Sequence, residues 1–385
     1  MVPPNTINFC LFAFFMATTV LHILSAIVVI LRANRSVPLR HDVPLPNVTI
    51  VRPISCNDQY LLETLKSTFE LSAGNYEIIF CAARVSDPAV EVARRLIAVY
   101  PHVRARLLIG DDRISQNPKL NNCVKGWRAA QSDYVVLIDS NVLLPRTYLS
   151  EMFDAWNFDC GLVSSPPVGD APGSFWATVE CAFLNTHQAR WQLFADELGL
   201  GFAQGKNLMF QKSMLESVGG LARLAHEPAE DAAATKVVRA AGLKVRLASR
   251  PFSQLLGKRN FPELLQRQIR WARLRRMTFA RYYLPEVFSG SVLPMAAAVG
   301  LAWRTGHDAL LVAGMILVMW YGTEVILARR MRWNVSPASP FSMIVRDLLL
   351  PVIWMAGWVS NSFEWQGHQM SGKREAPPVA AEPQM

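Results

Sequence analysis

Residues 134–140 read YVVLIDS, a short apolar run that ends in an acid. A run of this length, rich in β-branched residues and without polar alternation, is typical of a strand buried on both faces of a sheet. Similar runs occur upstream, at residues 47–54, 76–85 and 103–110. The segments between the runs have helix length, at residues 58–71, 88–99 and 120–131. This alternation predicts an α/β fold with a doubly wound, mostly parallel sheet.

Acids follow two of the predicted strands. Asp139 comes directly after the run at 134–138, and Asp87 comes shortly after the run at 76–85. In open α/β sheets a ligand lies beyond the carboxyl ends of the strands. Each acid can therefore bind a nucleotide or a metal ion, or it can simply cap the next helix, which suits Asp87 before Pro88.

A further pair of acids, Glu230 and Asp231, opens a predicted helix in the stretch EPAEDAAATKVVRAAGLKV. Acids at a helix N-terminus often only complement the helix dipole, and the alternative is that Asp231 acts as a general base. Nearby, GLGFAQGKN ends like a phosphate-binding loop. Asn207 stands where that loop has Ser or Thr, and its first glycine is missing, so we do not interpret the stretch as a phosphate loop.

The chain begins with a segment that predicts membrane insertion. Of its 385 residues 51% are hydrophobic and 18% are charged, and the formal net charge is +9. Residues 9–31 are uncharged and apolar, long enough for a bilayer. A cleaved signal peptide would have basic residues before this run, whereas Arg32, Arg35 and Arg40 follow it. Residues 1–35 are therefore predicted to be an uncleaved anchor, with the N-terminus outside the cell.

More apolar segments fall within residues 287–362, at 287–303, 309–328 and 343–362. The last segment is either a full span or an interfacial piece, because Arg346 and Asp347 lie near its start. We therefore predict one N-terminal and two to three C-terminal membrane helices. Residues 363–385 have a composition typical of disordered tails.

Between the membrane segments, residues 44–283 are predicted to form a cytoplasmic domain that ends in a basic helix at 263–283. This helix is amphipathic and can lie in the membrane surface. Because the basic clusters adjoin apolar sequence, a membrane is an expected partner and nucleic acid is not. Arginine exceeds lysine and alanine is common, which is typical of a GC-rich bacterial genome, so we predict a multi-pass protein of the bacterial inner membrane.

Taken in order, the motifs resemble the ceramide glucosyltransferase family, which comprises membrane-bound glycosyltransferases of the GT-A type. Hopanoid-associated glycosyltransferases are close relatives of that family. The matching residues are Asp87 in SDPAV, Asp139 in LIDSN, Asp231 in AED, and Arg267, Arg270 and Trp271 in RQIRW. The stretch LLIGDDRISQNPKLNN, with Lys119 and Asn122, also resembles a segment of the family.

The resemblance implies an inverting transfer of glucose from UDP-glucose to the primary hydroxyl of ceramide, in a GT-A domain at residues 44–283. It implies that Asp87 contacts the uridine and that Asp139 holds a divalent cation, Mg or Mn, against the diphosphate. Asp231 would be the base that takes the proton of the acceptor hydroxyl.

The remaining residues receive supporting roles from the same resemblance. Arg267 and Arg270 would bind the departing diphosphate, and Trp271 would stack on the sugar or line the lipid entrance. Lys119 and Asn122 would belong to the nucleotide side of the site, although a solvated lysine is an equal alternative for Lys119.

The sequence departs from the family pattern at several positions. Asn141 replaces a second acid after Asp139, Ala232 stands where the family commonly has tyrosine, and His187 lies one place from an expected histidine. With Asn141 in place of a second acid, a metal ion would be bound chiefly by Asp139 and the nucleotide.

The alternatives are transfer of another UDP-sugar, namely N-acetylglucosamine, galactose or glucuronic acid, to ceramide, a hopanoid or another lipid. A processive polysaccharide synthase is a further alternative, although it typically needs more membrane spans. A non-catalytic membrane scaffold would have lost one of the three aspartates.

Overall fold

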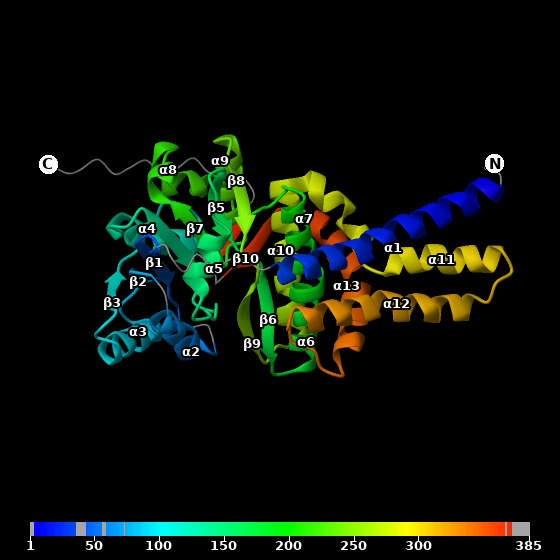
Figure 1. The fold of residues 1–385 in the computed structure, drawn as a ribbon, viewed down its shortest axis with the longest axis horizontal. Coiled ribbons are helices and arrows are strands. Elements are labelled where there is room, and N and C mark those ends of the chain that lie inside the picture. The colour runs from blue at the N-terminus through cyan, green and yellow to red at the C-terminus, as the bar shows by residue number, and fades with distance from the viewer. Residues whose placement is uncertain (1–3, 36–43, 56–58, 73, 366–367, 372–385) are drawn as a thin grey trace. The chain divides into compact units, whose positions relative to one another are not determined.

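The computed structural model describes residues 4–35, 44–55, 59–72, 74–365 and 368–371. The chain divides into two compact units (Figure 1). The sheet unit comprises Val37–Pro167, Gly199–Gln254 and Asn361–Met385, and the helical unit comprises Met1–Ser36, Val168–Leu198 and Leu255–Ser360. Neither unit is formed by one continuous stretch of sequence.

The sheet unit is built on a seven-stranded sheet with the order β3-β2-β1-β4-β7-β5-β8. The strands are β1 (Val48–Pro53), β2 (Tyr76–Ala82), β3 (Arg104–Ile109), β4 (Tyr134–Ile138), β5 (Cys160–Ser164), β7 (Asn207–Gln211) and β8 (Lys244–Leu247). Strand β7 runs antiparallel to its neighbours β4 and β5, and the other pairs are parallel. The predicted α/β class with a mostly parallel sheet is confirmed.

Helices cover both faces of this sheet because successive strand residues point to opposite faces. The helices of the unit are α2 (Leu61–Lys66), α3 (Pro88–Val99), α4 (Pro118–Ala129), α5 (Tyr148–Asp154), α8 (Lys212–Ser217) and α9 (Glu230–Ala240). Val51 and Ile79 pack with apolar residues of α4 and α9, whereas Ile78 packs with residues of α2 and α3. Residues of α5 complete the second face together with Ile50.

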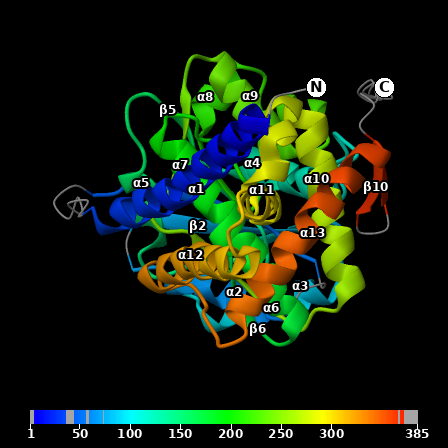
Figure 2. The ribbon, with the colours of Figure 1, turned by 90° about the vertical axis from the view of Figure 1, so that its right-hand side faces the viewer.

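The helical unit contains the apolar helices that the sequence predicts. Three of its helices, α1 (Pro4–Asn34), α12 (Ala309–Arg330) and α13 (Ser339–Val359), are long and apolar enough to cross a membrane. The shorter α11 (Val292–Arg304) follows the segment Phe261–Ser289 at a bend of 46°, and this bent pair could form a fourth span. Helices α1, α11 and α12 lie side by side (Figure 1, Figure 2). The predicted N-terminal and C-terminal membrane helices are thereby confirmed.

The charges that make the last apolar segment ambiguous in sequence are buried inside this unit. Arg346 of α13 forms a bidentate ion pair with Glu324 of α12, at 2.9 and 3.0 Å. Asp347 accepts hydrogen bonds from the Ser291 backbone and the Tyr321 hydroxyl. Because the charges are paired within the protein, α13 keeps its full length in spite of them.

Two further helical segments belong to the helical unit although they lie within residues 44–283. Helix α6 (Phe175–Ala182) continues through a π-helical turn (Phe183–Ala189) into α7 (Arg190–Glu197). Helix α10 (Phe261–Tyr283) begins with a capping box between Asn260 and Glu263 and is kinked at Phe279. The apolar side of α10 packs on α6 and α13, through Leu264, Ala272 and Tyr283, so that side is covered by protein.

Short strands complete the fold. Strands β6 (Pro167–Pro172) and β9 (Phe252–Gly257) pair where the chain passes between the units. Strands β10 (Ser362–Trp365) and β11 (His368–Ser371) form an antiparallel hairpin in the tail for which disorder is predicted. Residues 372–385 lie outside the described part of the chain.

Candidate active site

The register of two antiparallel strands brings Asp139 beside Lys206. Ile138 at the end of β4 pairs with Asn207 at the start of β7. The residue after β4, Asp139, therefore lies next to the residue before β7, Lys206. The Asp139 amide donates to the Lys206 carbonyl at 3.0 Å. The Lys206 ammonium in turn donates to Asp139 Oδ2 at 2.8 Å and to Asn141 Oδ1 at 3.0 Å.

The N-terminus of α4 delivers a second lysine to Asp139. Asn117 caps this helix by accepting from the amides of Lys119 and Leu120, and Pro118 occupies the first turn, as is common at helix starts. Lys119 Nζ then lies 2.6 Å from Asp139 Oδ1. Both carboxylate oxygens of Asp139 are therefore held by ammonium groups.

The N-terminus of α9 adds the two adjacent acids. Glu230 Oε1 lies 2.6 Å from Lys119 Nζ, and its other oxygen accepts from Asn117 Nδ2 at 2.7 Å. Asp231 accepts from the Gly205 amide at 2.9 Å and from the Ala232 amide at 2.7 Å. Gly205 also accepts a hydrogen bond from Lys119 through its carbonyl.

Gly205 is required by the closeness of these groups. A Cβ atom built at this position would lie 2.8 Å from Glu230 Oε1 and 3.5 Å from Lys119 Nζ. A side chain there would push the acids of α9 away from the segment that precedes β7. The glycine thus allows Lys119, Asp139, Glu230 and Asp231 to form one cluster in the sheet unit.

The pKa values of Asp139 and Asp231 are shifted in opposite directions, by the lysines and by burial respectively. Burial by itself would raise the pKa of Asp139, but Lys119 and Lys206 outweigh it and lower the pKa to about 2. Burial raises the pKa of Asp231 to about 6, with a further contribution from the negative charge of Glu230. Asp139 is thus a permanent anion, whereas Asp231 can exchange a proton near neutral pH.

A buried arginine fixes the turn that carries Asp139. Arg52 lies in β1 and is fully buried. Its guanidinium donates to the carbonyls of Asp139, Ser140 and Val142 at 2.8, 3.1 and 2.9 Å. Three backbone carbonyls of one turn are therefore bound by one rigid planar group.

Two predicted site residues make structural contacts near the carboxyl end of β2. Asp87 caps α3, since its carboxylate accepts from the Ala89 amide at 2.9 Å. Asn122 of α4 donates to the Cys81 carbonyl at the end of β2, at 2.6 Å, and accepts from Lys125. The structure brings Lys119, Asp139 and Asp231 into one bonded cluster, and the nucleotide-binding roles of Asp87 and Asn122 stay predictions.

The RQIRW residues lie on α10 in the helical unit. Arg267 Nη1 is 2.8 Å from Oε1 of Glu180, a fully buried acid of α6. Arg259 Nε approaches the other oxygen of Glu180 at 3.3 Å. The Arg267 guanidinium lies 5.0 Å from the ring centre of Trp271, which packs against α6. The predicted diphosphate contacts of Arg267 and Arg270 and the sugar or lipid contact of Trp271 stay predictions.

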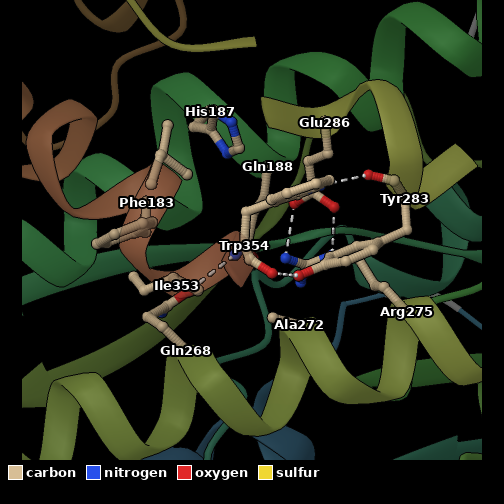
Figure 3. A pocket seen from close by; sticks show the side chains of 11 residues that line it. Phe183, His187, Gln188, Gln268, Ala272, Arg275, Tyr283, Glu286, Ile353 and Trp354 are labelled. Atoms are coloured by element: carbon tan, nitrogen blue, oxygen red, sulfur yellow. Dashed lines mark hydrogen bonds and ion pairs between the residues drawn. The ribbon is translucent and has the colours of Figure 1, made fainter. Parts of the chain in front are cut away.

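A small pocket in the helical unit is lined by residues of α10, α13 and the π-helical turn (Figure 3). His187 Nε2 lies 2.8 Å from Ser289 Oγ, and that hydroxyl donates to the Glu286 carbonyl. Because the hydroxyl proton is already used, His187 must donate from Nε2. Burial, followed by the charges of Arg346 and Arg190, keeps the pKa of His187 well below its usual value, so the ring is neutral.

The donor set around Asp139 permits a divalent cation only in part. Among the described residues, no group of three or more His, Cys, Asp and Glu residues is placed to hold a metal ion. Asp139 and Asn141 offer the hard oxygen atoms that Mg²⁺ prefers, and phosphate oxygens of a substrate commonly complete such sites. The Lys206 ammonium, however, already contacts both residues.

Several residues of the site are missed by reasoning from the sequence. Lys206 lies in GLGFAQGKN, the stretch that does not match a phosphate loop. Recognising that strand β7 begins directly after Lys206 would have placed this lysine at the sheet edge. Asn117 carries the N-cap pattern Asn-Pro, which indicates a helix start. The pattern does not indicate the contact of Asn117 with Glu230. Arg52 and Glu180 carry no local signal, because buried charges inside apolar elements are recognised only from their partners.

Comparisons with known proteins define the class of this fold and then the family. A mannosyltransferase from Pyrobaculum calidifontis, solved with GDP-mannose and Mn²⁺, has a similar fold with a TM-score of 0.51 at 18% identity. The match covers 88% of this chain and 99% of that protein, and it identifies the fold as that of the GT-A glycosyltransferases.

The sequence comparisons are more specific. Residues 6–376 match Glycosyl transferase family 21. Ceramide glucosyltransferase 1 of Caenorhabditis elegans is 26% identical over 336 residues, which is 85% of this chain and 72% of that protein. A ceramide glucosyltransferase of Komagataella phaffii is 40% identical over 126 residues, covering 31% of this chain and 25% of that protein. The chain belongs to glycosyl transferase family 21, and it is a membrane-bound glycosyltransferase.

Proposed function

We propose that the protein transfers glucose from UDP-glucose to the primary hydroxyl of ceramide at the membrane surface, with inversion at the anomeric carbon. The observation that carries the proposal is Asp231. It is a half-buried acid whose pKa is raised to about 6 and whose carboxylate is oriented by two backbone amides. A carboxylate of this kind suits the removal of a proton from a hydroxyl near neutral pH.

The reaction is a single displacement. Asp231 accepts the proton of the acceptor hydroxyl while the hydroxyl oxygen forms a bond to the anomeric carbon. The bond from that carbon to the diphosphate breaks, and UDP leaves with its electron pair. A divalent cation held by Asp139 and Asn141 would supply positive charge to the leaving diphosphate.

Other residues complete the proposed donor and acceptor sites. Asp87 is assigned to the uridine, Lys119 and Asn122 to the nucleotide side, and Arg267 and Arg270 to the diphosphate. Trp271 is assigned to the sugar or the lipid. These roles follow the family motifs, and each matches the chemistry of its side chain.

The lipid acceptor is supported by the apolar helices that precede and follow the sheet unit. A ceramide keeps its chains in the bilayer and presents its hydroxyl at the interface, so a membrane-bound transferase meets it there. The names of the relatives point to the same acceptor. We place the protein in the bacterial inner membrane with the sheet unit in the cytoplasm, where nucleotide sugars are made.

The test uses the purified chain in lipid vesicles. UDP-glucose, UDP-galactose, UDP-N-acetylglucosamine and UDP-glucuronic acid are each paired with ceramide, diacylglycerol or a hopanoid polyol. Products are identified by mass spectrometry, and the anomeric configuration by NMR. We expect a β-linked hexosylceramide from UDP-glucose.

The same experiment distinguishes the alternatives. A product formed only with the hopanoid polyol, or only from UDP-N-acetylglucosamine, would overturn the proposed substrates while keeping the reaction class. A polymer longer than one sugar would indicate a processive synthase. An α-linked product would exclude the single displacement.

A further inference from the structure

The two lysines that bind Asp139 differ in what else they hold. Lys119 Nζ contacts Asp139 and Glu230 at 2.6 Å each and donates to the Gly205 carbonyl. Three acceptors on three segments of the chain match the three protons of an ammonium group. Lys119 therefore connects α4, α9 and the turn after β4, and moving it would leave the buried Glu230 and the half-buried Asp139 without this partner.

Lys206 instead bridges two oxygen atoms of a single turn. Its ammonium lies 2.8 Å from Asp139 Oδ2 and 3.0 Å from Asn141 Oδ1. A carboxylate and a carboxamide oxygen that converge on one point form a donor pair for a hard cation. In this structure the cation at that point is the lysine side chain.

Only the side chain of Lys206 needs to move in order to release these oxygens. The Lys206 carbonyl is fixed by the Asp139 amide, and the next residue is fixed by the pairing of β4 with β7. Lysine carries a compact charge on a flexible four-carbon chain, so its ammonium can reach new acceptors without a change in the sheet.

The charges of the cluster favour such an exchange when a diphosphate is present. Asp139, Glu230 and Asp231 supply acidic groups, and Lys119 and Lys206 balance part of their charge. Without a substrate, a divalent cation would have to compete with the Lys206 ammonium for Asp139. A bound diphosphate adds negative charge and phosphate oxygens, which offer the displaced ammonium a new partner.

We propose that Lys206 is a built-in counter-ion that competes with the divalent cation for Asp139 and Asn141. The cation then binds weakly to the protein alone and strongly together with the sugar nucleotide. This inference rests on the proposed function, because it places the donor diphosphate beside Asp139. Lys206 thereby determines that the metal ion binds together with the sugar nucleotide.

The test is Mn²⁺ binding to the detergent-solubilised full chain without nucleotide, measured from the free Mn²⁺ signal in electron paramagnetic resonance. Lys206→Met removes the charge but keeps the length of the side chain, so we expect it to tighten Mn²⁺ binding by roughly tenfold or more, the usual range of coupling between competing ligands. Lys206→Arg keeps the charge and should bind Mn²⁺ as weakly as the unchanged protein. Asp139→Asn, combined with Lys206→Met, should abolish the gain.

Lys212→Met is the matched control, because Lys212 lies in the same unit and donates to the Ala130 carbonyl away from the cluster. We expect no change in Mn²⁺ binding for this variant. Equal or weaker Mn²⁺ binding by a Lys206→Met protein with an unchanged thermal melting curve would overturn the inference. If that variant does not fold, Lys206→Gln with the same readout decides.

The outcome is separable from that of the proposed function. Mn²⁺ binding without nucleotide does not depend on which sugar or lipid the protein uses. Suppose that Lys206→Met binds Mn²⁺ more tightly and that the unchanged protein forms no hexosylceramide. The role of Lys206 as counter-ion would then be kept, and the proposed substrates would be rejected.

Discussion

The two aspartates of the cluster show how surroundings assign different chemistry to one residue type. Asp139 has an ammonium group on each oxygen, so its negative charge persists at any physiological pH. The oxygens of Asp231 accept hydrogen bonds from two backbone amides, and burial together with the neighbouring Glu230 outweighs the charge of Lys119 and raises its pKa. The first can hold a cation, and the second can hold a proton.

The first prediction follows from the role proposed for Asp231. Asp231→Asn should lower turnover by at least about a hundredfold, because the amide cannot accept the proton of the hydroxyl. Binding of UDP-glucose, measured by calorimetry, should stay close to that of the unchanged protein. Asp133→Asn is the control, since Asp133 is an exposed acid at the opposite end of β4. Turnover within a few fold of the control would reject Asp231 as the base.

The second prediction concerns pH. The pKa of Asp231 is raised to about 6, so its basic form is present above that pH and is lost as the pH falls through it. We expect kcat/KM to be level above about pH 7 and to fall tenfold per pH unit below about pH 5. Initial rates across this range check the expectation. A profile that stays level down to about pH 4.5 would show that a group with an ordinary carboxyl pKa limits the reaction.

At the scale of elements, the first half of the sheet could be predicted and the second half could not. The predicted strands at 47–54, 76–85, 103–110 and 134–140 contain β1 to β4, and the helix predicted at 88–99 has the same bounds as α3. The strands are recognised by their apolar runs, and α3 is recognised by its capping residue and the proline that follows it. Strands β5, β7 and β8 are short and contain few β-branched residues. Their pairing depends on contacts distant in sequence, so local patterns do not indicate them.

The same limit applies to the candidate site. Asp139 and Asp231 are predicted because one follows a strand and the other opens a helix, and Lys119 is predicted from the family resemblance. The contact between Asp139 and Lys206 depends on the antiparallel position of β7, which no local signal specifies. The partner of Arg267 was missed because Glu180 lies in a separate helix and looks in sequence like an ordinary polar position.

The third prediction is set at the contact between α6 and α10. Glu180 is fully buried and compensates Arg259 and Arg267. Glu180→Gln keeps the size but removes the charge, which should destabilise the fold by about 3 kcal/mol because two arginines lose their buried partner. Thermal unfolding in detergent, followed by tryptophan fluorescence, measures the change. Glu91→Gln on the exposed side of α3 serves as the control, and an equal melting temperature for both variants would contradict the expectation.

At the scale of the whole molecule, charged groups also connect the apolar helices. Arg190 donates to His22 of α1 at 2.8 Å and lies 3.9 Å from Glu324 of α12. Arg346 of α13 binds the same Glu324. Ionised groups within membrane helices are costly unless they are paired. Their pairing links the three long apolar helices α1, α12 and α13 with α7, which favours one specific arrangement of these helices.

The fourth prediction tests the membrane topology. The arginines after the first apolar run predict that the N-terminus is outside and the sheet unit is cytoplasmic. Phe158 is 98% exposed in the sheet unit, and His307 is exposed between α11 and α12. In a chain with Cys10 and Cys56 changed to serine, Phe158→Cys should react with an impermeant maleimide only after the cells are permeabilised. His307→Cys should react in intact cells, and the reverse pattern would invert the topology.

The interleaving of the two units sets an order for biosynthesis. The anchor α1 leaves the ribosome before the strands β1 to β4. Strand β5 then remains unpaired, because its sheet neighbours β7 and β8 are translated only after α6 and α7. Until residue 247 has emerged, the nascent chain carries unpaired strand edges, which are prone to pair with other chains. Because α1 precedes these strands in the chain, they are synthesised on a nascent chain that already carries a membrane anchor.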